Sequence, residues 1–238
     1  TLTDPEELQL LSRLLGVPLT AEKGEPSGLV LRQAEPLKAV MGAAVRQKSG
    51  QAVNGDAGVC FKSENGKMYL LLCDGMGSGP EAAHDSGMTA RLLEQFLRAG
   101  VEPEDALRTV NGALALYGEE NGGFSTVDLA DVDLWTGDVA LEKLGACASW
   151  LIRGDHVKKL EASSLPLGVM EEARSTSVEC RLHSGDILVM LSDGISDVFP
   201  DEAQMRKMLE ESVYIQPQRM ADALIRNAIL ASGSTPRD

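Results

Sequence analysis

Three short turn sequences, each containing glycine followed by aspartate, recur between strand-like segments in the second half of the chain. They are Thr136-Gly137-Asp138, Arg153-Gly154-Asp155 and Ser184-Gly185-Asp186. Connectors of this length can join antiparallel strands, whereas a parallel pair needs a crossover of a dozen or more residues. This half of the chain therefore predicts antiparallel sheet rather than repeated βαβ units.

Strand-like and helix-like segments are grouped along the chain rather than alternating. The predicted strands cover 67–73, 126–134, 139–144, 146–153, 157–160, 175–182 and 187–191. Residues 80–97 and 103–117 carry apolar side chains at helical spacing and should form an antiparallel helical pair, and a last helix is predicted over 217–231. This grouping predicts an α+β domain in which sheet packs on sheet with helices outside.

The first 28 residues have a different pattern. Asp4 to Leu15 predicts an amphipathic helix that begins at Asp4-Pro5 and ends at Gly16. Residues 20–28 are rich in proline, glycine and charge, which is typical of a linker. We therefore expect residues 1–28 to form a helix and linker that serve packing, regulation or formation of a homodimer, and residues 29–238 to form the main domain.

The amino-acid composition of the chain limits the kinds of molecule that it can bind. The 238 residues are 43% hydrophobic and carry a formal net charge of -14, which permits one substantial core and disfavours binding to nucleic acid or to an anionic membrane surface. The four cysteines show no C-x-x-C spacing, which favours reduced thiols and a cytoplasmic domain. The sequence does not begin with methionine, so we expect a segment of a longer protein, and a membrane anchor elsewhere in that protein is compatible with this interpretation.

Two Asp-Gly pairs follow strand-like runs that are far apart in sequence. Asp74-Gly75 follows 67–73 and Asp193-Gly194 follows 187–191. A single Asp-Gly pair usually marks a tight turn. Together with Asp56, which lies in Asn54-Gly55-Asp56, the pairs instead indicate a shared site for Mg²⁺ or Mn²⁺, because both ions prefer hard oxygen ligands.

Other chemical interpretations of the same residues are weaker. Gly75-Met76-Gly77-Ser78-Gly79 is similar to the start of a dinucleotide-binding turn, but Pro80 takes the place of the third glycine and Asp74 would repel a pyrophosphate. A nucleotide-binding enzyme is therefore the least favoured hypothesis. The three histidines are widely spaced, which argues against a histidine zinc site.

Cys147 and Arg153 have the C-x5-R spacing of a cysteine phosphatase loop. The five residues between them contain no glycine that could turn backbone N–H groups toward a phosphate. A buried strand is the favoured interpretation of this segment.

Several motifs together resemble the PP2C-type metal-dependent serine/threonine phosphatases. They are Asn54-Gly55-Asp56, the block 73–79, Leu165-Pro166-Leu167-Gly168, Ser184-Gly185-Asp186 and Leu191-Ser192-Asp193-Gly194. Their order and spacing are most similar to the bacterial sporulation branch, over roughly Val40 to Asp238. The resemblance implies an αββα sandwich of two antiparallel sheets flanked by helices, in which 29–238 is the phosphatase domain without its last strand.

The resemblance also implies a centre of two Mn²⁺ or Mg²⁺ ions. By motif, Asp74 corresponds to the carboxylate that bridges the two ions, and Gly75 to the residue whose carbonyl binds one of them. Asp193 corresponds to a further ligand and Asp56 to an upstream acidic residue near the metals. Asp238 is the candidate for the ligand that opens the last motif of the family.

The function implied by the resemblance is hydrolysis of phosphoserine by a water that the metals activate, with no protein nucleophile. The implied substrate is a phosphorylated anti-sigma-factor antagonist, whose dephosphorylation activates a sporulation sigma factor. A different class of function stays open, in which the chain keeps the phosphatase fold as a catalytically impaired regulatory or scaffolding domain.

Overall fold

The computed structural model describes residues 4–23, 28–47, 53–121, 124–170, 175–199 and 201–233. A five-stranded antiparallel sheet has the order β3-β4-β5-β6-β9. Its strands are β3 (Asp56–Lys62), β4 (Lys67–Gly75), β5 (Ser125–Asp133), β6 (Asp138–Leu144) and β9 (Thr176–Arg181). A three-stranded antiparallel sheet has the order β10-β7-β8, with β10 (Ile187–Val189), β7 (Ser149–Arg153) and β8 (His156–Leu160).

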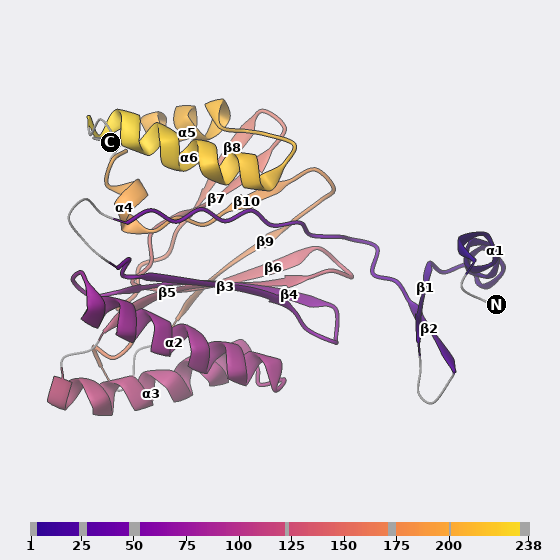
Figure 1. The fold of residues 1–238 in the computed structure, drawn as a ribbon, viewed down its shortest axis with the longest axis horizontal. Helices are drawn as coiled ribbons and strands as arrows, with labels where there is room; N and C mark the ends of the chain where they lie inside the picture. Colours follow the sequence, from indigo (N-terminus) through magenta and orange to yellow (C-terminus); the bar gives the residue numbers. More distant parts are fainter. Residues whose placement is uncertain are drawn as a thin grey trace.

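The two sheets pack face to face with helices outside (Figure 1). Helices α2 (Pro80–Arg98) and α3 (Pro103–Asn121) lie side by side on the outer face of the five-stranded sheet. Helices α5 (Glu202–Glu211) and α6 (Pro217–Ala231) cover the three-stranded sheet, and the single turn α4 (Asp193–Ser196) lies between β10 and α5 in the chain. The predicted αββα sandwich of two antiparallel sheets is confirmed.

The core consists of three apolar layers that follow this order of helices and sheets. One lies between α2, α3 and the five-stranded sheet, the second between the two sheets, and the third between the three-stranded sheet and α5 and α6. Strand β5 takes part in two of them, because neighbouring side chains in a strand point to opposite faces. Leu129 faces the helices and Ala130 faces the second sheet, and both are fully buried.

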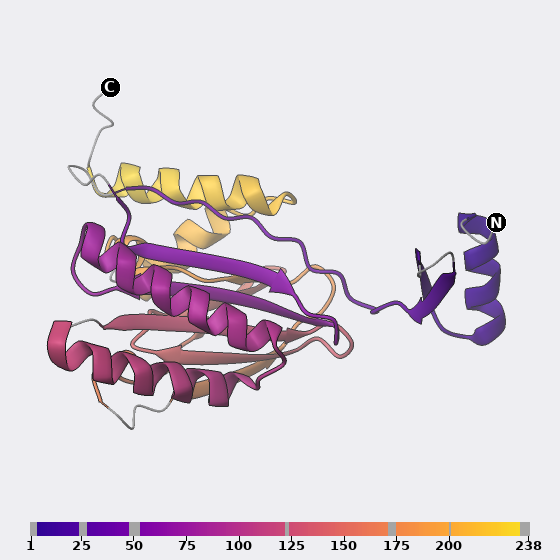
Figure 2. The same cartoon turned by 60° about the horizontal axis from the view of Figure 1, so that its bottom comes forward.

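The N-terminal unit lies away from this sandwich (Figure 2). Helix α1 (Pro5–Leu15) is followed by a two-stranded sheet of β1 (Leu19–Lys23) and β2 (Leu29–Gln33). The expected linker over 20–28 is therefore wrong in its first part, and residues 24–27 lie outside the described ranges. Strand β2 pairs with β1 and so belongs to this unit, although the sequence placed it in the main domain.

The connection between the two units is an extended segment, residues 34–47, which runs over the sandwich to α6 (Figures 1 and 2). The Ala43 backbone exchanges two hydrogen bonds with the Gln218 side chain, at 3.2 and 2.8 Å. A Cβ atom on Gly42 would lie 2.2 Å from the backbone of Pro217. Only glycine can therefore bring this segment so close to the start of α6.

Most predicted elements are confirmed, with end shifts of at most four residues. Besides β1, β2 and the short α4, the sequence missed β3 and α5. Strand β3 opens with Asp-Ala-Gly, which carries little strand signal, and α5 buries only Met205, Met208 and Leu209. No helix in the described ranges is both long and apolar enough to cross a membrane.

Candidate metal centre

Three aspartates that are distant in sequence meet at one edge of the sandwich. Asp56 begins β3 and lies directly opposite Asp74, near the end of β4, in the antiparallel register. Asp193 is the first residue of α4. The Ser192 hydroxyl, immediately before it, donates a 2.9 Å hydrogen bond to Asp56 Oδ2. The structure thus brings together the three carboxylates that the sequence singled out.

The carboxyl of Asp74 has a raised pKa. Burial raises its pKa to about 7, with further contributions from the negative charges of Asp56 and Asp193 and from hydrogen bonds to both side chains. Burial and nearby like charges both disfavour the ionised form. A cation among the three carboxylates would remove this penalty.

Gly75 occupies a position where only glycine fits. A Cβ atom there would lie 2.0 Å from the carbonyl oxygen of Ala82, in the first turn of α2. The Ser125 hydroxyl donates a 3.2 Å hydrogen bond to the carbonyl of Asp74, and the Gly75 N–H donates to the carbonyl of Gly55 at 3.3 Å. The close approach of α2 and these bonds fix the backbone that carries the Asp74 carboxylate.

The donor chemistry fits a hard divalent cation, because carboxylate and carbonyl oxygens are the ligands that Mg²⁺ and Mn²⁺ prefer. Asp56, Asp74 and Asp193 also line a cleft of about 1940 Å³ that extends along residues 36–47 and α6. Among the described residues, no group of three or more histidine, cysteine or acidic side chains is placed so that it could hold a metal ion as it stands. Asp238, the fourth predicted carboxylate, lies outside those residues.

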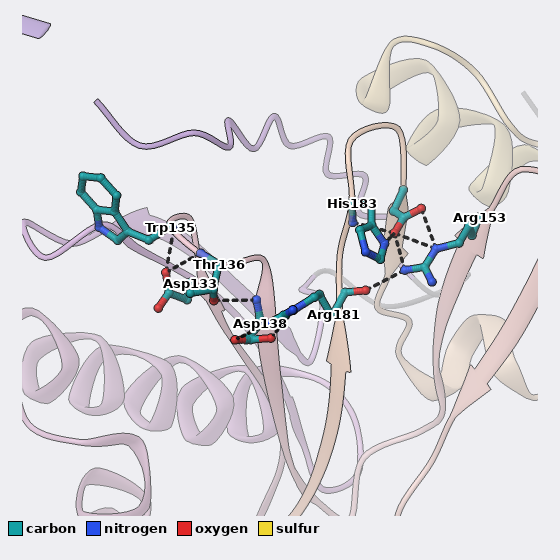
Figure 3. A network of polar contacts seen from close by, with 8 residues as sticks. Asp133, Trp135, Thr136, Asp138, Arg153, Arg181 and His183 are labelled. Carbon is teal, nitrogen blue, oxygen red and sulfur yellow. Dashed lines mark hydrogen bonds and ion pairs between the residues drawn. The ribbon is translucent and has the colours of Figure 1, made fainter. Parts of the chain in front are cut away.

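Two of the three glycine-aspartate turns have a structural role that the ion pairs show. In Ser184-Gly185-Asp186, the Asp186 carboxylate accepts a hydrogen bond from the His183 N–H at 2.8 Å. The same carboxylate forms an ion pair with the Arg153 guanidinium at 2.6 Å. Asp138 forms an ion pair with Arg181 at 2.6 Å (Figure 3). Asp138 joins the paired ends of β6 and β9, and Asp186 ties the connection between β9 and β10 to the end of β7. Because β9 and β10 lie in different sheets, this third turn is a crossover between sheets and not a hairpin. Among the ion pairs of the described residues, neither Asp74 nor Asp193 has a cationic partner of this kind.

The structure argues against a cysteine phosphatase loop. The Arg153 side chain donates to the carbonyl of Arg181 at 2.7 Å (Figure 3) and also to the Asp186 carboxylate. Arg153 ends β7, whereas Cys147 lies just before its first residue, so the two side chains are at opposite ends of the strand. Burial raises the pKa of the Cys147 thiol, which keeps it protonated and poorly nucleophilic.

We therefore expect Cys147→Ser to retain most of any metal-dependent hydrolysis of a phosphorylated substrate. Its initial rate should lie within about threefold of the wild-type rate, the size of effect that a substitution outside the site usually has. The measurement is the initial rate at saturating Mn²⁺, together with the thermal midpoint. A loss of activity at an unchanged thermal midpoint would mean that the thiol takes part in the reaction.

The raised pKa of Asp74 has a consequence for stability that can be measured without metal. An aspartate whose pKa is raised on folding costs stability as the pH rises from its ordinary value near 3.8 to about 7. Asparagine at position 74 carries no charge at any pH and so avoids this cost. Solvent screening of the half-buried carboxyl keeps the difference near roughly 1 kcal/mol, so Asp74→Asn is expected to raise Tm at pH 8 by about 2–4 °C.

This increase should shrink as the pH is lowered toward 5, where Asp74 of the wild type is largely protonated. Thermal unfolding followed by circular dichroism in chelator-containing buffer measures both values. An equal difference at pH 5 and pH 8 would show that the charge of Asp74 is not the cause.

Comparison with known proteins identifies the family. Residues 64–238 match the family model described as Stage II sporulation protein E (SpoIIE). The chain belongs to the SpoIIE family. Stage II sporulation protein E of Priestia megaterium is 35% identical over 192 residues, and that of Bacillus subtilis (strain 168) is 34% identical over 192 residues. Each match covers 79% of this chain but only 33% and 23% of the respective relative.

A solved structure of SpoIIE from Bacillus subtilis, containing the PP2C phosphatase domain and a fragment of the regulatory domain, has the same fold. The TM-score is 0.78 at 28% sequence identity, and the match covers 96% of this chain and 71% of that chain. The αββα sandwich is thus the PP2C phosphatase fold, in a family whose structural neighbours are serine/threonine phosphatases.

Proposed function

We propose that this SpoIIE-family chain is a metal-dependent protein serine/threonine phosphatase. The observation that carries the proposal is the convergence of Asp56, Asp74 and Asp193 at one edge of a PP2C fold. The substrate that we propose is a phosphorylated anti-sigma-factor antagonist, whose dephosphorylation would activate a sporulation sigma factor. This substrate rests on the family resemblance.

The residues proposed to hold two Mn²⁺ or Mg²⁺ ions are Asp56, Asp74 and Asp193, with the Gly75 carbonyl and Asp238. When bound, such ions lower the pKa of water and neutralise charge on a phosphoryl group. The Asp74 carboxyl must lose its proton to act as a ligand, which its pKa of about 7 permits near neutral pH. The backbone of Gly75, held against α2, fixes the geometry of this ligand.

Electrostatics explains why activity should depend on metal. A phosphoserine carries close to two negative charges at neutral pH, and three carboxylates lie where it would approach along the cleft. Without cations, the like charges repel the substrate. When cations are bound, the same carboxylates hold the positive charges that attract the phosphoserine.

The direct test is hydrolysis of a phosphoserine peptide as a function of Mn²⁺ concentration. The proposal predicts release of inorganic phosphate that saturates with Mn²⁺ and stops when the metal is chelated. A folded chain that binds Mn²⁺ but releases no phosphate would favour the regulatory or scaffolding alternative. Hydrolysis that persists in excess chelator would contradict a metal-dependent mechanism.

A further inference from the structure

A buried ionic cluster lies beside the three aspartates. The Lys143 ammonium donates to Asp128 Oδ2 at 2.7 Å, to the carbonyl of Cys147 at 2.7 Å and to Ser149 Oγ at 2.9 Å. The Ser149 hydroxyl is also 2.5 Å from Asp128 Oδ2. The side chains of Lys143 and Asp128 are 0% and 2% exposed. All three donor directions of the ammonium are thus used inside the protein.

The cluster joins the two sheets. Asp128 lies on β5 and Lys143 on β6, in the five-stranded sheet, where they are directly paired in the register. Ser149 begins β7 of the other sheet. Because a buried ion pair costs desolvation and often contributes little net stability, a cluster of this kind is better explained by the position that it imposes on its members.

One oxygen of the cluster remains unused. Oδ1 of Asp128 is buried and has no hydrogen-bond partner among the described residues. Asp128 lines a cavity of about 60 Å³ that is also lined by Asp74, Asp193 and Thr126. A cavity of this size can hold water, and it is polar enough to retain it. An ionised carboxylate only accepts hydrogen bonds, so a water that bridges Asp128 to an ionised ligand carboxylate would donate to both.

We propose that Asp128 is a positioning residue for the metal ligands, acting through a water in this cavity that donates to Asp128 Oδ1 and to the carboxylate of Asp74 or Asp193. The inference rests on the proposed function. Lys143 and Ser149 hold the Asp128 carboxylate in place, and the charge of Lys143 cancels that of Asp128, so that Asp128 orients the ligand carboxylates without adding to their mutual repulsion.

Asp131 provides a matched control on the same strand. Its side chain is also mostly buried and ion-paired, to Lys67 at 2.7 Å, and its Oδ1 also has no partner among the described residues. It lies three residues from Asp128, on the opposite face of β5, and is not among the residues that line the cavity. Asp131→Asn therefore removes a comparable buried charge at a distance from the metal ligands.

The experiment is calorimetric titration of the 238-residue chain with Mn²⁺, well below the thermal midpoint of each variant. Asp128→Asn is expected to weaken Mn²⁺ binding by about tenfold, the lower end of what loss of an outer hydrogen-bond partner costs at metal sites. Asp131→Asn is expected to keep the wild-type Kd. If Asp128→Asn does not fold, Ser149→Ala is expected to weaken binding severalfold in the same direction, because it loosens Asp128 while leaving its charge.

Three results would overturn the inference. The first is a wild-type Kd for Mn²⁺ in the folded Asp128→Asn or Ser149→Ala variant. The second is that Asp131→Asn weakens Mn²⁺ binding as much as Asp128→Asn does. The third is that Asp128→Asn binds one Mn²⁺ fewer per chain than the wild type, which would make Asp128 itself a ligand. Asp74→Asn separates the inference from the proposed function. If Asp74→Asn abolishes binding while Asp128→Asn binds as the wild type does, only the inference fails, and if the wild type binds no Mn²⁺, both fail.

Discussion

Asp74→Asn is expected to lower the Mn²⁺-dependent rate of phosphoserine hydrolysis by at least about a thousandfold. The side chain keeps its shape but loses the charge that would join two cations at the edge of β4. Lewis-acid stabilisation at such a site contributes several kcal/mol, and each 1.36 kcal/mol is about tenfold in rate. The measurement is kcat/KM for a phosphoserine peptide at saturating Mn²⁺.

Asp155→Asn is the control, since Asp155 is exposed in the turn between β7 and β8, away from the three carboxylates. It should retain the wild-type rate. Asp193→Asn should reproduce the loss seen with Asp74→Asn. Wild-type kcat/KM in folded Asp74→Asn and Asp193→Asn variants would exclude these residues as ligands.

Lys143→Met is expected to destabilise the protein by about 3–5 kcal/mol, the cost of leaving a buried charge without its partner. In a chain of this size, that corresponds to a fall in Tm of about 6–20 °C. The reason is that Asp128 and Ser149 would lose the only ammonium within hydrogen-bonding distance among the described residues. Thermal and denaturant unfolding in the absence of metal measures the effect.

A second substitution tests the cause of this loss. Adding Asp128→Leu to Lys143→Met removes the uncompensated carboxylate and should restore part of the lost stability, because an apolar pair can replace a buried ion pair at little cost. If the double variant were less stable than Lys143→Met, lost packing rather than an unpaired charge would explain the destabilisation.

The hairpin turns and the helical pair could be predicted because their signals are local. Glycine followed by aspartate marks the turn between β5 and β6, and α2 carries its apolar face at regular spacing. The Asp-Gly pairs at 74 and 193 were visible for the same reason. Their convergence with Asp56 was expected from the metal preference for oxygen ligands and from the family resemblance, but its geometry could not be derived from local signals, since antiparallel register is set by contacts between distant segments.

The buried cluster shows what local pattern cannot show. A lysine in a strand usually marks the solvent face, and Asp128 in β5 carries no signal that separates it from Asp131 or Asp133. Only the packing of β7 against this strand pair makes Lys143 fully buried. Strand β1 was also missed, because it is recognised only through its pairing with β2, which follows a segment rich in glycine and charge.

We propose that Asp56, Asp74 and Asp193 together hold divalent cations. Anomalous scattering at the manganese edge, from crystals grown with Mn²⁺, tests it most directly. We expect anomalous peaks within about 2.0–2.6 Å of carboxylate oxygens of Asp74 and Asp193, with Asp56 beside them. Well-diffracting crystals with no manganese peak at this edge of the sandwich, at Mn²⁺ concentrations that saturate activity, would contradict it.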